Sequence, residues 1–312
     1  MNQIPLIGLT ALAGLTSPLL GQADSIEATS LLGRPLVRPA MSTAARATAE
    51  ANLAIAKRAF DRTPTNADSI IWLGRRTAYL GRFREAIGIY TKGIESHPND
   101  PRLYRHRGHR FLSTRRLDQA IADFEKADSL TRGQPDEVEP DGQPNAKGIP
   151  TSTLQSNIRY HLGLAHYLKG DFERALPYYQ RDVEAAVNPD MVVASSHWLY
   201  MTLRRLGRNR PAAKVLAPIT AGMEVIENGS YHRLLLMYKG LLAADSVLTP
   251  GDRGDAVQDA TVAYGVGNWH LYNGRTKEAR AIFERILAMP QWGAFGFIAA
   301  EAEVARMDRR RP

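Results

Sequence analysis

The sequence predicts an all-α fold, a right-handed α-solenoid of about five to six helix pairs with a C-terminal closing helix and no β-sheet. The main observation is an internal repeat, because residues 67–100 and 101–134 align without a gap at a spacing of 34 residues. Small and aromatic residues also recur at equivalent positions of the two segments: Gly74 and Gly108, Ala86 and Ala120, Tyr90 and Phe124, Gly93 and Ala127. An unrelated helical bundle is not expected to repeat such a pattern at one fixed period.

The pattern continues downstream with growing departures. Further copies are predicted at 156–189, 193–226 and 260–293, with a degenerate copy at 227–259. Tyr200 stands where a small residue is expected, and the Thr-Pro-Gly-Asp stretch at 249–252 breaks the second half of the degenerate copy. Residues 43–61 are predicted to form a lone helix ahead of the array. Residues 292–307 are predicted to form an amphipathic helix that covers its last repeat.

The period and its pattern resemble the tetratricopeptide repeat, which has Leu-Gly early, Ala in the middle, an aromatic residue four positions later and Pro near the end. Leu162-Gly163 and Pro98 are examples in this chain. The resemblance implies two helices per repeat, with the first helices lining a concave surface. Gly and Ala at facing positions let the two helices approach closely, while the aromatic residue fills the space between neighbouring pairs. Gly81 is expected in the turn between the helices, where a positive φ is useful.

The solenoid is predicted to span 42–312, with an insertion at 132–153. Prolines exclude a helix in the insertion, which also carries a group of acidic residues: Asp136, Glu137, Glu139 and Asp141. These acids lack the alternate-position spacing of an EF-hand calcium loop. We expect the insertion to pack against the solenoid or to lie across its groove. Residues 24–41 contain two prolines and are predicted to be a flexible tether.

The N-terminal segment is apolar from Ile4 to Leu20 and ends in small residues before Asp24. We interpret 1–23 as a signal peptide, which predicts a periplasmic or secreted protein. No Lys or Arg precedes the apolar run, so an unstructured or partly packed tail on a cytoplasmic protein is the alternative. The run is too short and too interrupted by Gly and Pro to predict a membrane span.

Composition argues against several classes of function. The chain has 40 Lys and Arg against 32 Asp and Glu, a modest and scattered excess without a nucleic-acid-binding motif, so no nucleic-acid partner is predicted. Cysteine is absent, which excludes disulfides and thiolate zinc sites. A Walker loop, a nucleophile elbow and an H-E-x-x-H helix are also lacking. We therefore assign no catalytic residue, cofactor or metal, and favour a binding protein over an enzyme without deciding between them.

The inward positions of the first helices follow from the resemblance, and in this chain they are rich in Arg, His, Tyr, Trp and Asn. Arg binds carboxylates and phosphates through paired hydrogen bonds, and aromatic rings offer stacking surfaces. The first repeat contributes Trp72, Arg75 and Tyr79 to this surface. The candidate ligand-binding residues are Arg105, His106, His109, Asn157, Tyr160, His161, His197, Trp198, Arg204, Tyr264 and Asn268.

We therefore predict a scaffold that binds a protein or peptide in this basic groove, where Arg105, His106 and Arg204 would anchor an anionic group. The acidic insertion is a candidate lid, and histidines titrating near ~6.5 would strengthen the binding of an anion at lower pH. The alternative is an enzyme or metal-binding protein, for which His106, His109 and His161 form the candidate cluster. The identity of the ligand and the oligomeric state are left open by the sequence.

Overall fold

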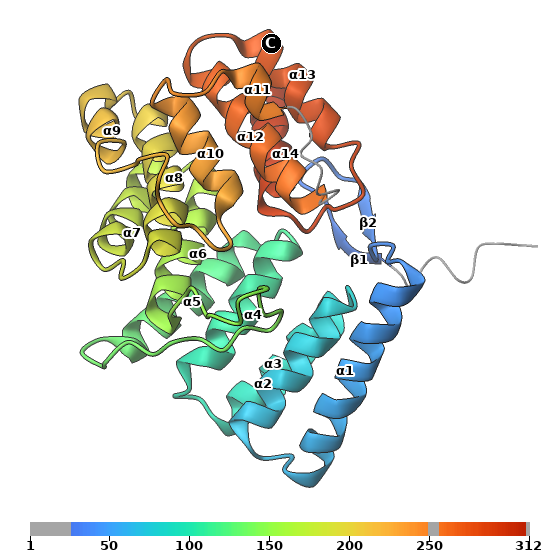
Figure 1. Ribbon diagram of the computed structural model, residues 1–312. Coiled ribbons are helices and arrows are strands. Elements are labelled where there is room, and N and C mark those ends of the chain that lie inside the picture. Colours follow the sequence, from blue (N-terminus) through green and yellow to red (C-terminus); the bar gives the residue numbers. More distant parts are fainter. Residues whose placement is uncertain (1–25, 249–255, 310–312) are drawn as a thin grey trace, which may run out of the picture.

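A computed structural model describes residues 26–248 and 256–309, in which a short hairpin precedes a curved array of helices (Figure 1). The expected signal peptide at 1–23 and the predicted break at 249–252 lie outside these residues. The strands are β1 (Ile26–Thr29) and β2 (Pro35–Val37). The helices are α1 (Thr43–Arg62), α2 (Ala67–Tyr79), α3 (Phe83–Ser96), α4 (Pro101–Ser113), α5 (Leu117–Thr131), α6 (Leu154–Lys169), α7 (Phe172–Glu184), α8 (Pro189–Arg205), α9 (Asn209–Val215), α10 (Gly229–Tyr238), α11 (Ala244–Leu248), α12 (Ala256–Tyr272), α13 (Thr276–Ile286) and α14 (Phe295–Arg309).

The helices from α2 to α13 pack as consecutive pairs, which confirms the predicted α-solenoid. Six pairs are present in the described chain, and the fifth is reduced by its short second helix α11. None of the described helices is both long enough and apolar enough to cross a membrane.

Local signals set the bounds of the repeat helices. Four first helices begin after a residue whose side chain accepts a hydrogen bond from a first-turn backbone N–H: Asn66, Asp100, Thr153 and Asn188. Five of the turns that follow first helices contain a glycine with φ between 71° and 88°: Gly81, Gly170, Gly207, Gly240 and Gly274. The backbone therefore turns at a constant place in each repeat.

Close contacts between a glycine and an aromatic ring join the two helices of four pairs. A Cβ atom built on the glycine would lie only 2.4–3.0 Å from the ring in each case: Gly74 against Tyr90, Gly108 against Phe124, Gly163 against Tyr179, and Gly267 against Phe283. The repeated small and aromatic positions of the sequence therefore face one another across the pair.

The predicted tether and the predicted absence of a sheet need correction at the N-terminal side. Strands β1 and β2 pair antiparallel, and the hairpin packs beside α14 (Figure 1). The N–H of Leu31 donates to Glu301 Oε1 at 2.6 Å, and Trp292 Nε1 donates to the carbonyl oxygen of Val37 at 2.6 Å. These contacts with residues far away in the sequence hold the segment in place, whereas its prolines alone suggested a flexible chain.

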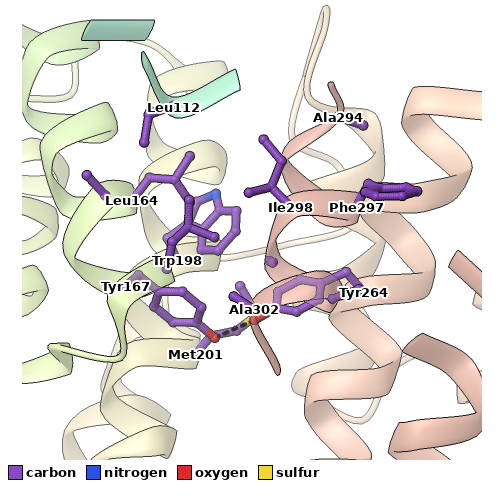
Figure 2. Packing of buried hydrophobic residues seen from close by; sticks show 14 of the residues in the cluster. Leu112, Leu164, Tyr167, Trp198, Met201, Tyr264, Ala294, Phe297, Ile298 and Ala302 are labelled. Carbon is purple, nitrogen blue, oxygen red and sulfur yellow. Dashed lines mark hydrogen bonds between the residues drawn. The ribbon is translucent and has the colours of Figure 1, made fainter. Parts of the chain in front are cut away.

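The closing helix α14 covers the last pair, as expected, and also enters the curve of the array. Figure 2 shows Ile298 and Ala302 of α14 facing Leu164 and Tyr167 of α6, with Tyr264 of α12 on the other side. Every residue from 296 to 305 in this helix is buried. Much of the inner surface is therefore occupied by the chain itself.

Candidate ligand-binding groove

The first part of the groove, along α2, α4 and the start of α6, is covered by residues 137–142 of the insertion, which we call the strap. The backbone of the strap pairs with the returning chain, because Glu139 N–H donates to Ser152 O at 3.1 Å and Leu154 N–H donates to Glu137 O at 2.8 Å. At its far end, Arg76 Nη1 donates to Gly142 O at 2.7 Å. The strap is thus pinned at both ends.

Glu139 of the strap contacts three of the predicted groove residues. Its Oε2 lies 2.9 Å from Arg105 Nε and accepts a hydrogen bond from Asn157 Nδ2 at 3.1 Å. Its Oε1 lies 3.9 Å from His106 Nε2. The side chains of Glu139 and Arg105 are each only 9% exposed, so this ion pair is screened from water far less than a surface pair would be.

A cavity of about 250 Å³ lies between the strap and the first two repeats. Arg75 and Arg102 line it together with His106, and Trp72 and Leu154 supply apolar wall. The guanidinium of Arg102 is already held by Asp68 and Asp100, each at 2.6 Å. This cavity is part of the predicted groove and lies beneath the strap.

The middle of the groove is filled by α14 rather than left free. The ring of Phe295 lies 5.4 Å from the rings of His109 and His161 and 6.3 Å from that of Tyr160, between centroids. The two histidines are in turn 4.6 Å apart. No group of three His, Cys, Asp or Glu side chains suited to a metal ion comes together among the described residues, so the alternative metal cluster finds no ligand set there.

The histidines of the groove do not titrate near ~6.5, which corrects the pH dependence expected above. Burial is the largest cause and lowers the pKa of His106, His109 and His161 well below the ordinary value; neighbouring arginines, Arg105 among them, lower it further. These rings are therefore neutral at physiological pH and cannot add positive charge for an anionic ligand.

Four further predicted residues belong to the core. His197 is fully buried and stacks on Tyr231 at 4.5 Å, and burial lowers its pKa to about 3. Trp198 Nε1 donates to Tyr160 Oη at 2.7 Å. The other two meet at one phenol oxygen, since both Tyr264 Oη and Asn268 Nδ2 donate to Tyr167 Oη, at 2.9 and 3.0 Å. Helices α10, α12 and α14 close over this end of the groove, which the periodic pattern could not indicate.

Arg204 is not part of one anchor with Arg105. Its Nη1 donates to Tyr200 Oη at 3.0 Å and its Nη2 donates to Asn273 Oδ1 at 2.9 Å, while its guanidinium lies 4.3 Å from the ring centre of Tyr272. Arg105 instead meets the strap. The three predicted anchors therefore separate into a pair under the strap and a single arginine between α8 and α12.

Sequence reasoning missed Arg115 and Glu301, which form a buried ion pair between the α4–α5 turn and α14. A signal was present for Arg115, because it stands 34 residues after Gly81, where a turn glycine is expected. No comparable signal marks Glu301, since α14 lies outside the repeats.

Comparison with known proteins agrees with this architecture. Models of the tetratricopeptide repeat match residues 73–136 and 159–190. No protein of curated function matches the chain significantly in sequence.

Solved structures with loose similarity include two tetratricopeptide-repeat proteins and a third protein, BtubC. The tetratricopeptide-repeat protein YrrB, described as having an unusual peptide-binding site, shares 16% identity over 80% of this chain and 97% of its own, with a TM-score of 0.42. A tetratricopeptide-repeat protein from Parabacteroides merdae shares 14% identity over 80% of this chain and 91% of its own, with a TM-score of 0.48. BtubC (BKLC) from P. vanneervenii shares 18% identity over 86% of this chain and 93% of its own, with a TM-score of 0.42. From the two matched family models and the glycine–aromatic packing repeated along its helix pairs, the chain contains tetratricopeptide repeats.

Proposed function

We propose that this protein is an interaction scaffold that binds an extended acidic peptide along α2, α4 and α6, in the place now taken by the strap. The observation that carries the proposal is the position of Glu139. A carboxylate on a non-helical segment lies in the groove against Arg105 and Asn157, two of the residues that the sequence selected for ligand binding. Glu139 thus stands where the carboxylate of a bound peptide would lie.

The strap is easier to displace than α14. Its side chains outside the Glu139 contact are largely exposed, with Val138 at 63%. A long run of α14 is buried in the core instead. Local opening has the lowest free energy where few apolar contacts are lost. The groove is therefore expected to open at the strap while α14 stays in place.

The buried ion pair makes opening selective for acidic ligands. Leaving Arg105 buried without a carboxylate costs about 3–5 kcal/mol, the usual penalty of breaking a buried pair by removing one partner. A peptide that supplies its own carboxylate avoids this cost, while Glu139 gains hydration outside the groove. A neutral peptide leaves Arg105 unpaired and does not avoid this cost, so acidic and neutral peptides should differ strongly in affinity.

The test compares a labelled oligoglutamate peptide with an oligoglutamine peptide of equal length by fluorescence anisotropy. Glu139→Gln weakens the internal competitor and should tighten oligoglutamate binding by about tenfold, whereas Arg105→Ala should abolish it. Glu137→Gln is the matched control, because this neighbouring carboxylate is exposed and its side chain contacts no groove arginine within ion-pair distance. Equal affinities of the Glu137→Gln and Glu139→Gln variants, or full binding by Arg105→Ala, would refute the proposal.

Capture of natural partners provides a second readout. Protein bound by the wild type should be lost with Arg105→Ala and retained with Arg204→Ala, since Arg204 is engaged between α8 and α12. Loss of the partner with both variants would mean that the whole predicted groove, and not only its part under the strap, is the binding surface. Retention of the partner with both variants would mean that the binding surface lies on another face of the protein.

A further inference from the structure

Arg75 is a buried cation without an acceptor. The residue is 8% exposed, and its guanidinium carbon lies 4.6 Å from the ring centre of Trp72. Within residues 26–248 and 256–309, no oxygen lies at hydrogen-bond or ion-pair distance from its guanidinium. A guanidinium without a protein acceptor is available to pair with an anion that enters beside it.

Three acidic side chains lie around Arg75, and none of them forms an ion pair with it. Asp68 binds Arg102, and Glu139 binds Arg105 and Asn157. Asp141 is close enough for an electrostatic influence: burial raises the pKa of Asp141 and the charge of Arg75 opposes that rise, yet no ion pair joins the two residues. Arg75 therefore has no ion-pair partner among the described residues, while the carboxylate of Asp141 close to it also stays unpaired, with its Oδ2 buried.

Arg75 lines the cavity of about 250 Å³ beneath the strap. The apolar part of the wall comes from Ile71, Trp72, Val138 and Leu154. The acidic part consists of Asp68, Glu137 and Glu139; Asp68 shares Arg102 with Asp100, and Glu139 pairs with Arg105. A ligand with a single negative charge and a compact apolar body fits this wall, while a dianion such as phosphate would be repelled by the acids.

We propose that the cavity binds a small monocarboxylate whose carboxylate lies on Arg75 and whose apolar body lies against Ile71, Val138 and Leu154, with the strap closed. The inference does not depend on the peptide-binding function proposed above. The small ligand holds the strap in place, because Val138 forms part of its site, whereas an acidic peptide displaces the strap. The two ligands would therefore compete.

Benzoate is a suitable probe, with benzamide as its neutral isostere and inorganic phosphate as an anion without an apolar body. Calorimetric titration of the full chain should show saturable binding of benzoate and none of the other two. Affinity should fall by at least about tenfold in Arg75→Gln and remain unchanged in Arg58→Gln, which removes an equal charge from an exposed position on α1. Equal binding of benzamide or phosphate, or undiminished binding by Arg75→Gln, would overturn the inference.

A second measurement covers the case in which Arg75→Gln does not fold. Arg75→Lys keeps the charge but loses the planar fork that pairs with a carboxylate, so benzoate affinity should still drop. Hydrogen exchange of the wild-type strap, residues 137–142, should slow when benzoate binds. Unchanged or faster exchange at saturating benzoate would contradict binding beneath a closed strap.

Discussion

Replacing Arg115 with glycine tests how α14 is held inside the repeat array. Arg115 has φ 64° and is the only non-glycine residue with positive φ in the described chain. It lies 34 residues after Gly81, at the turn where other repeats have glycine. A left-handed conformation costs a residue with a side chain about 1–2 kcal/mol, and glycine avoids that cost.

The side chain of Arg115 offsets this strain through contacts with the C-terminal region. Its Nε and Nη2 pair with the two carboxylate oxygens of Glu301 at 3.1 and 2.9 Å, and Nη2 also donates to Trp292 O at 2.9 Å. Both charged side chains are at most 2% exposed. Glu301 additionally accepts from the N–H of Leu31, so a single ion pair ties the second repeat, α14 and the hairpin together.

The expected effect of Arg115→Gly is the difference of two terms. Removing one partner of a buried ion pair costs about 3–5 kcal/mol, and relief of the backbone strain returns about 1–2 kcal/mol. The variant should thus be less stable by about 1–4 kcal/mol, and Arg115→Ala should be less stable still because it keeps the strain. Gly207→Ala measures the strain alone, since Gly207 has φ 71° and its added Cβ would meet no atom within 4 Å.

Urea unfolding followed by circular dichroism gives the stabilities, and hydrogen exchange of α14 locates the loss. Combining Arg115→Gly with Glu301→Gln should cost less than the sum of the single changes, because the second change removes the charge that the first leaves unpaired. A wild-type or higher stability for Arg115→Gly, with unchanged exchange in α14, would refute the reasoning.

Three further predictions concern packing, pH and the N-terminus. Leucine at position 108 or 120 should lower stability by about 1–3 kcal/mol through overpacking. A Cβ added at Gly108 would lie 3.0 Å from Phe124, and Ala120 is fully buried. Unchanged urea midpoints for both variants would disprove the predicted pairing of the helices. The folded-state pKa values of four buried histidines lie below the unfolded value of ~6.5: His106, His109, His161 and His197. The stability that they contribute should therefore be complete above that pH and fall on acidification, by up to about 1.4 kcal/mol per pH unit for each histidine. A flat profile of urea midpoints from pH 8 to 5 would contradict this. Burial raises the pKa of Asp182 to about 6, and this carboxyl therefore contributes a slope of opposite sign below that value. N-terminal sequencing of the natural protein should begin near Asp24, and an intact Met1 would exclude the signal peptide.

The helix pairs were predictable because the contacts that form them are local and periodic. Gly74 and Tyr90 lie within one repeat, and the same contact recurs at Gly163 and Tyr179. Side-chain caps and turn glycines likewise act within a few residues of the backbone that they satisfy. Fold class and repeat spacing therefore follow from the pattern of residues along the chain, and the inward face of the first helices follows from the family resemblance.

What fills that inward face was decided by tertiary contacts alone. Arg105 was recognisable as an inward arginine, but its pairing with Glu139 depends on how the insertion crosses the groove. His197 matched a ligand-binding position, yet tyrosines from α10 bury it. Arg115 and Glu301 are 186 residues apart and belong to no common period. Repeat periodicity specifies how each helix pair packs on the next, whereas the strap and α14 occupy the groove through single long-range pairs that no period encodes.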